Sequence, residues 1–232
     1  VEIALQARSG DAALAAARAW SQAIPVSPDA DRFELQILLA LNRVSDTTSV
    51  LRRLVEQAPI QARNEVIGAI PQIYGRVPDK AAALAVVRDA LAPALKQPQH
   101  AAAAWTSIGQ MELANDLLAP ALTSARNGHA ADQASPAPAL LALDLMERGQ
   151  MAAETIVRSQ LKVSPPAAGK PSTVALSYAR LLFDSQRQNE ARALLEELTR
   201  TEPDAIEPWL LLATIQVQDR QLAAATRSVQ TF

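Results

Sequence analysis

The feature that most constrains this chain is a set of prolines that close helical segments at regular intervals. Pro25, Pro59 and Pro93 follow one another at spacings of 34 residues. Proline lacks an amide hydrogen and clashes with the preceding helical turn, so each of these residues marks a helix end. In "TEPDAIEPWLLLA", Pro208 comes five residues after Pro203 and suits the first turn of a new helix. The pattern therefore predicts helices that stop and restart at a fixed interval.

The clearest unit is a helical hairpin that Pro203 closes. Each of its two helices places its apolar residues on one face, and the second has the i, i+3, i+4, i+7 spacing of an amphipathic helix. The polar stretch "DSQRQNE" separates them. The apolar positions are Ala175, Tyr178, Ala179 and Leu182 in the first helix and Ala191, Leu194, Leu195 and Leu198 in the second.

The same register recurs before other prolines. Packed helices lie about 8–10 Å apart, so their closest approach leaves room for little more than a methyl group. A small residue twelve positions before each closing proline suits such a crossing. Before Pro25, Pro59, Pro93, Pro165 and Pro203, this residue is Ala13, Thr47, Ala81, Ala153 and Ala191, and the residue eight positions before is Ala17, Leu51, Ala85, Val157 and Leu195. We predict hairpins near 28–59, 60–97, 100–127, 137–165 and 172–203, with part of one before 25 and another from 206.

A 34-residue period with a small crossing residue and a closing proline resembles the tetratricopeptide repeat (TPR) family. Residues 172–205 place Ala191 and Pro203 at matching positions, and Trp209 stands at the aromatic position of the next unit. Gln216 departs from the family's tyrosine. The resemblance implies an all-α protein, an α-solenoid of antiparallel hairpins with a right-handed superhelix. We expect a single domain over 1–232 as a fragment of a longer protein, with better-matched repeats over 1–59 and 172–232 and irregular ones over 60–171.

The irregular middle carries its own expectations. Pro71 lies inside "IGAIPQIYG", where it is expected to interrupt a first helix. The two longest breaks are predicted in "NGHAADQASPAP" (127–138) and "SPPAAGKPS" (164–172), which are rich in turn-forming residues.

Composition and missing motifs argue against several classes of function. A net charge of −2 with both signs mixed along the chain does not suit a nucleic acid. No apolar run approaches the roughly 18–20 residues that span a membrane. Phosphate-loop, GxSxG and HExxH motifs are missing from the sequence. His100 and His129 lack cysteine or carboxylate company at ligand spacing, so we interpret both as solvated. We expect no enzyme, no metal and no cofactor.

The family resemblance implies that first-helix residues line the inner face of the array. This lining mixes apolar and polar groups, which suits a peptide or a partner helix. We therefore predict a non-enzymatic scaffold that binds a protein or peptide on this face. A solvated pair of Arg180 with Asp184 is the alternative for those two residues. The predicted partner-binding residues are Arg32, Phe33, Gln36, Thr173, Ser177, Arg180, Phe183, Asp184, Thr214 and Gln218.

Two other classes stay open. A structural spacer of a larger bacterial envelope protein would self-associate through open repeat ends. An α-helical enzyme or small-molecule sensor would need a polar pocket, which the sequence does not display. The opening "EIALQARSGDAALAAARAW" resembles TPR proteins of Gram-negative bacteria, some of them envelope lipoproteins. That resemblance favours a periplasmic or membrane-tethered location, through a segment before Val1, over a cytoplasmic one.

Overall fold

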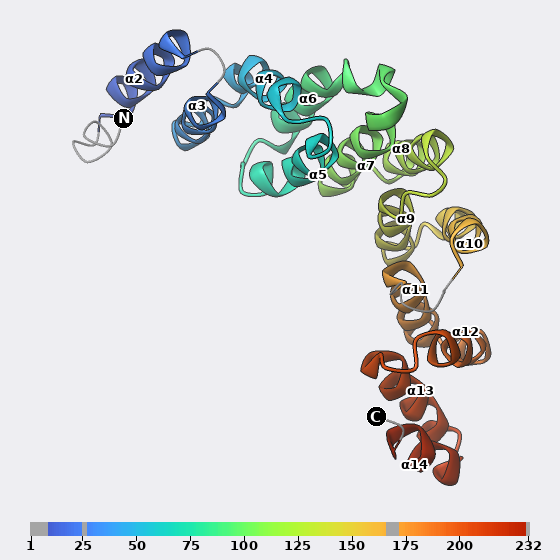
Figure 1. Ribbon diagram of the computed structural model, residues 1–232. Helices are drawn as coiled ribbons and strands as arrows, with labels where there is room; N and C mark the ends of the chain where they lie inside the picture. The colour runs from blue at the N-terminus through green and yellow to red at the C-terminus, as the bar shows by residue number, and fades with distance from the viewer. Residues whose placement is uncertain (1–8, 25–26, 166–171, 231–232) are drawn as a thin grey trace. The chain divides into compact units, whose positions relative to one another are not determined.

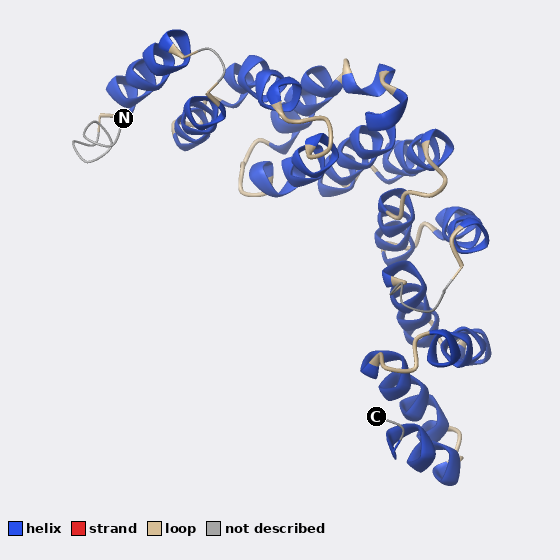
Figure 2. Cartoon of the chain, viewed as in Figure 1, coloured by secondary structure: helices blue, strands red, loops and turns tan. Residues whose placement is uncertain are grey.

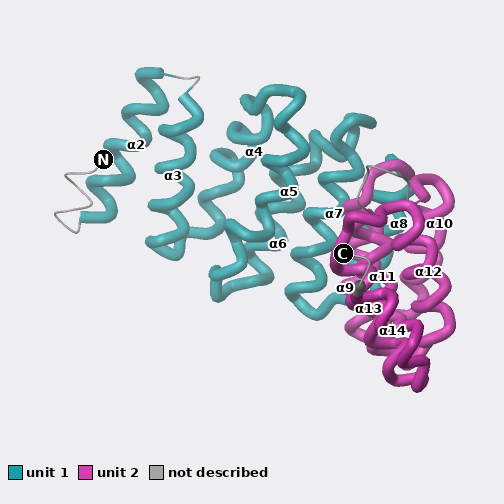
Figure 3. The backbone as a smooth tube through the Cα atoms, turned by 60° about the horizontal axis from the view of Figure 1, so that its bottom comes forward, with its two compact units in different colours: residues 1–132 teal, residues 133–232 magenta. Residues whose placement is uncertain are grey.

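A computed structural model describes residues 9–24, 27–165 and 172–230 of the chain. These residues form helices and loops and contain no strand (Figure 2). The predicted all-α class, built from repeated helical hairpins, is confirmed. The chain divides into two compact units, 1–132 and 133–232 (Figure 3). The prediction of a single domain over 1–232 stays a prediction.

Unit 1 consists of successive helices packed in pairs (Figure 1). Helix α2 packs on α3, α3 on α4, and α7 on α8; α4 also packs on α6, and α5 on α7. In order, the elements are α2 (Gly10–Ala23), α3 (Pro28–Ala40), the 3₁₀ turn η1 (Val44–Thr47), α4 (Thr48–Gln57), α5 (Arg63–Tyr74), α6 (Lys80–Leu91), η2 (Ala94–Lys96), α7 (Pro98–Ala114) and α8 (Leu118–Ala131).

Unit 2 repeats the same arrangement. Its first helices α9, α11 and α13 contact one another in sequence, and each also packs against the second helix of its own hairpin (Figure 1). The elements are α9 (Ala137–Glu147), η3 (Met151–Ala153), α10 (Glu154–Val163), α11 (Thr173–Asp184), α12 (Gln188–Thr201), α13 (Ile206–Gln218) and α14 (Leu222–Gln230).

The turn inside five of the hairpins follows one rule, and the turn between α5 and α6 differs, because Gly75 there has φ −59°. Helices α3, α7, α9, α11 and α13 are each followed, two positions after their last residue, by a residue with positive φ. The next amide then donates to a carbonyl five residues back, as in a Schellman motif. The positive-φ residues are Asn42, Asp116, Gly149, Gln186 and Arg220, and the amides belong to Arg43, Leu117, Gln150, Arg187 and Gln221, with N···O distances of 2.8–2.9 Å. This shared turn sets the second helix antiparallel to the first.

The predicted crossing residues are buried in four of the five hairpins. Ala13, Thr47, Ala153 and Ala191 are all 0% exposed. The register before Pro93 is wrong, because Ala81 and Ala85 are exposed. Helix α6 has 12 residues, whereas α2 and α12 have 14 and η1 with α4 spans residues 44–57, so counting back from Pro93 overshoots by two. Counted from the helix start, the residue equivalent to Ala191 is Ala83, which is 1% exposed.

Two further expectations are corrected, and a third agrees with the ends of the flanking helices. Helix α5 continues through Pro71 to Tyr74, because a proline in the last turn removes only one hydrogen bond of the helix. The break predicted over 127–138 is shorter, since α8 runs to Ala131 and α9 begins at Ala137. Around the break predicted over 164–172, α10 ends at Val163 and α11 begins at Thr173, and residues 166–171 lie outside the described part.

The two histidines are buried rather than solvated. His100 is 2% exposed in the first turn of α7, and its Nδ1 lies 2.7 Å from Oδ1 of Asn64. His129 is 9% exposed in the last turn of α8. Burial lowers the pKa of both imidazoles because it disfavours the charged form. Both side chains therefore belong to the packing of unit 1.

Candidate functional site

Three of the predicted groove residues of unit 2, Thr173, Ser177 and Arg180, meet at a cleft between the first helices α11 and α13. The cleft has a volume of about 330 Å³. Its apolar lining comes from α11, from the end of α12 and from the start of α13, and hydroxyl groups of α11 stand on one side. The lining residues are Ser172, Thr173, Leu176, Ser177, Arg180, Leu198, Glu202, Ala205, Ile206, Glu207 and Pro208.

Local interactions shape both walls of this cleft. The Oγ of Ser172 accepts a hydrogen bond from Ala175 N at 3.2 Å and so caps α11. Across the cleft, the indole Nε1 of Trp209 donates to the carbonyl oxygen of Pro203 at 2.9 Å. This bond holds the connection between α12 and α13, where the chain stops one helix and starts the next. From this stretch, Ala205, Ile206, Glu207 and Pro208 line one wall of the cleft.

Charged groups stand at the rim. The guanidinium Nη2 of Arg180 lies 3.1 Å from Oε1 of Glu207, which joins α11 to α13. Its partner is thus a glutamate of the next repeat and not Asp184, the alternative that the sequence suggested. Both side chains are more than half exposed, so the pair contributes little to stability and stays available to a ligand. Glu202 accepts a hydrogen bond from the Ser172 amide at 3.0 Å.

The other predicted site residues of unit 2 lie outside this cleft. Phe183 and Asp184 are at the end of α11, and Asp184 is exposed. Thr214 is exposed on α13, and its hydroxyl donates to the Leu210 carbonyl. Gln218 accepts a hydrogen bond from Gln188 at 3.0 Å. The structure therefore brings together Thr173, Ser177 and Arg180.

The predicted residues of unit 1 lie on α3. Arg32 forms an exposed pair with Asp29 at 3.2 Å. Phe33 is partly buried, and its ring lies 5.9 Å from that of Trp20 on α2. Such aromatic pairs stabilise helix packing. Gln36 is exposed.

A network of charges joins α10, α11 and α12 at the other side of α11. Glu154 Oε1 accepts hydrogen bonds from Tyr178 Oη at 2.5 Å and from Arg187 Nη2 at 2.8 Å. The bond from Arg187 is the main reason that the pKa of Glu154 falls to about 2. Burial, followed by the bond to Glu154, raises the pKa of Tyr178 to about 12. Near neutral pH neither group exchanges a proton, so the network holds helices together rather than performing acid–base chemistry.

This network predicts a specific sensitivity to acid. The pKa of Glu154 is lowered in the folded protein, so its contribution to stability is complete above its ordinary pKa near 4.5 and is lost as pH falls from there toward about 2. Glu154→Gln is expected to flatten the fall of unfolding free energy over this window. Urea unfolding at a series of pH values measures it. Glu196→Gln, at an exposed position of α12, is the control, and an unchanged profile in Glu154→Gln would contradict the network's role.

The described residues contain neither a cluster of metal-binding side chains nor a helix that could span a membrane. No group of three histidine, cysteine or acidic side chains there could hold a metal ion. Among the helices described, none combines the length and the apolar character that crossing a membrane requires.

Comparison with known proteins points to one family. The sequence over 173–215 matches the family described as tetratricopeptide repeat. The crystal structure of a tetratricopeptide repeat protein from Parabacteroides merdae ATCC 43184 is also similar, with a TM-score of 0.45 and 14% identity over 99% of this chain and 88% of that chain. No curated protein matches the chain in sequence. The link to envelope lipoproteins stays a prediction. The segment that forms α11, α12 and most of α13, and with them much of the lining of the cleft, matches the tetratricopeptide repeat family.

Proposed function

We propose that the cleft between α11 and α13 binds a peptide or helix of a protein partner, and that the chain is a non-enzymatic interaction scaffold. Tetratricopeptide repeats generally mediate protein–protein interactions. The observation that carries the proposal is the meeting of Thr173, Ser177 and Arg180 at one cleft inside the matched segment. The family resemblance and the register of the repeat together predict these residues.

The chemistry of the cleft suits a peptide that inserts an apolar side chain while its backbone forms hydrogen bonds at the rim. Leu176 supplies apolar surface, the buried Leu198 and Pro208 complete the apolar lining, and the hydroxyls of Thr173 and Ser177 can orient a peptide amide or carbonyl. Along α13, Ile206 and Leu210 continue this surface at i, i+4 spacing and are 52% and 48% exposed. Exposed apolar side chains that gather on one helix face are typical of interaction sites.

An affinity capture with a blocking variant tests this proposal. The chain is used as bait in an extract of its source organism, beside Ser177→Arg, which fills the cleft, and Thr226→Arg on the exposed side of α14. A retained partner is identified and its affinity measured. Loss of a central contact commonly costs 2 kcal/mol or more, so Ser177→Arg is expected to weaken binding at least about tenfold. Thr226→Arg is expected to bind as the unchanged chain does.

Equal retention by both variants would place the partner elsewhere. Circular dichroism of Ser177→Arg shows whether the helices are intact, so that a loss of binding is assigned to the cleft and not to unfolding.

The alternative, a self-assembling spacer, has one observation in its favour. Leu222 and Val229 lie seven positions apart on α14, which places them on one face, and they are 65% and 48% exposed. Contact between copies would cover them. In the same capture, this alternative predicts that the bait retains copies of itself and no other protein. The periplasmic or membrane-tethered location remains a prediction from the sequence.

A further inference from the structure

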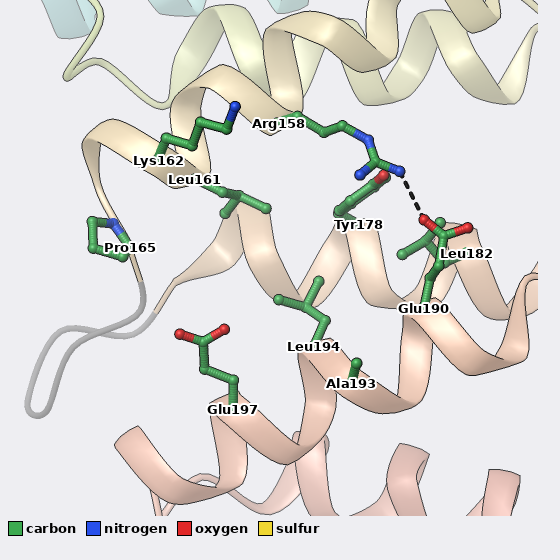
Figure 4. A pocket seen from close by; sticks show the side chains of 10 residues that line it. All are labelled: Arg158, Leu161, Lys162, Pro165, Tyr178, Leu182, Glu190, Ala193, Leu194 and Glu197. Carbon is green, nitrogen blue, oxygen red and sulfur yellow. Dashed lines mark hydrogen bonds and ion pairs between the residues drawn. The ribbon is translucent and has the colours of Figure 1, made fainter.

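A second groove lies on the opposite side of unit 2, between the second helices α10 and α12. In unit 1 the second helices α4 and α6 pack directly, whereas α10 and α12 scarcely contact each other. A hollow of about 470 Å³ separates them, and Tyr178 and Leu182 of α11 form its floor (Figure 4). It is independent of the first cleft, because other residues of α11 line that one.

Each wall of this groove is one continuous helix face. On α10 the wall runs through Arg158, Leu161 and Lys162, and on α12 through Glu190, Ala193, Leu194 and Glu197. The α12 residues follow the i, i+3, i+4, i+7 spacing, which covers about 10 Å or two helical turns at 1.5 Å per residue. Leu161 and Leu194 are half-buried on opposite walls. The groove is thus as long as two turns of a bound helix and has an apolar centre between charged ends.

The two walls carry opposite charge. At one end, Arg158 Nη2 lies 2.7 Å from Glu190 Oε2 and links the walls. At the other end, Lys162 and Glu197 stand on opposite sides of the hollow (Figure 4). Within the described part of the chain, no ion pair joins either of these two to another residue. An exposed cation and a partly exposed carboxylate thus flank this end, where a partner can pair with both.

We propose that this groove binds an amphipathic helix of a partner protein that carries carboxylates along one flank and cations along the other. The apolar stripe of such a helix lies between Leu161 and Leu194, as in other helix-in-groove complexes. Its acidic flank faces Lys162 and its basic flank faces Glu197. Opposite charges at the rim mainly set which partner is accepted and steer its approach. A helix with a single sign of charge meets repulsion at one wall.

Three synthetic helical peptides with the same leucine stripe test the proposal. The first has one acidic and one basic flank, the second has two acidic flanks, and the third has two basic flanks. Binding is followed by fluorescence anisotropy of the labelled peptides. Since an exposed ion pair contributes up to about 1 kcal/mol, the mixed peptide is expected to bind about fivefold more tightly than either of the others.

Charge reversals at the two walls are expected to change the ranking in opposite directions. Lys162→Glu makes both walls acidic at that end, so the basic peptide becomes the preferred one. Glu197→Lys makes both basic there, so the acidic peptide becomes preferred. Lys96→Glu and Glu65→Lys, at exposed positions of unit 1, are matched controls that keep the original ranking.

Several results would overturn the proposal. These are equal affinity of the three peptides, no saturable binding of any of them, and a ranking that survives both reversals. Loss of binding in Ser177→Arg would also overturn it, because that substitution alters only the cleft between α11 and α13.

Discussion

Replacing Arg53 with methionine is expected to lower the unfolding free energy of unit 1 by about 3 kcal/mol. The guanidinium Nη2 of Arg53 donates to Asp31 Oδ1 at 2.8 Å and to Glu34 Oε2 at 2.9 Å. These carboxylate side chains are only 1% and 7% exposed. Methionine keeps an unbranched stem of similar size but removes the charge, so two carboxylates stay buried with less compensation. The side chain of Arg53 is 38% exposed, which puts the effect at the low end for a buried pair.

The remaining partners of the two carboxylates do not replace Arg53. Glu34 keeps Arg18, whose Nε lies 3.0 Å away, and Asp31 keeps the hydroxyl of Ser21 at 3.1 Å. The second oxygen of Asp31 is buried and has no hydrogen-bond partner among the described residues. Hydrogen bonding to Asp31 is also the main reason that the pKa of Arg53 is raised. Asp31 is therefore the carboxylate that the substitution of Arg53 destabilises most.

Urea unfolding measures this effect, with Arg32→Met as the matched control. Arg32 pairs with Asp29 at the surface, where both side chains are about two-thirds exposed, so its loss is expected to change stability by less than about 0.5 kcal/mol. Adding Asp31→Asn and Glu34→Gln to Arg53→Met removes the buried charges and is expected to recover part of the loss. Similar stability of the two methionine variants would show that the carboxylates do not depend on Arg53.

Much of the helix layout could be predicted because its signals are local. Closing prolines and the apolar period appear within single helices, and the helix pairs lie where they were predicted. The failure before Pro93 shows the limit of that method. A count from one helix end assumes a constant helix length, and α6 is two residues shorter than α12. Its true start is marked by Asp79, whose side chain accepts a hydrogen bond from Ala82 N at 2.9 Å.

The prediction that both histidines are solvated is wrong, because their burial depends on tertiary packing. "PQHAAA" resembles a solvated helix start, yet the side chain of His100 meets Asn64, which lies 36 residues earlier. His129 lies within the break that its turn-forming neighbours predict over 127–138, but α8 continues to Ala131 and includes it. Nothing local to either residue indicates its burial.

Only one wall of the cleft could be predicted, because the other wall comes from a different repeat. The period of α11 identifies Thr173, Ser177 and Arg180 as one face. The opposite wall comes from Ile206, Glu207 and Pro208 in the next repeat. The sequence marks that stretch as a boundary between helices but does not indicate which residues face α11. The groove between α10 and α12 could not be predicted from the sequence, because it depends on the distance between two second helices.

Replacing Ala191 with leucine is expected to destabilise unit 2 by about 1–3 kcal/mol through overpacking. Ala191 is fully buried near the start of α12, which packs against α11. Three additional carbons at a close helix crossing require the helices to separate or the side chain to leave its preferred rotamer. Ala193→Leu, on the exposed side of the same helix, adds the same atoms without this cost. Thermal melting of the two variants separates overpacking from a general effect of leucine, and an unchanged melting curve for Ala191→Leu would contradict the register of the repeat.

An alanine-to-leucine substitution in α6 likewise decides between two possible registers of the hairpin before Pro93. Counting back from Pro93 places the crossing at Ala81, whereas counting from the start of α6 places it at Ala83. Because Ala81 is exposed and Ala83 is 1% exposed, Ala83→Leu is expected to lower the melting temperature as Ala191→Leu does, and Ala81→Leu to leave it nearly unchanged. The opposite order would mean that the closing proline sets the register. The expected order means that the start of α6, and not Pro93, sets the register of this hairpin.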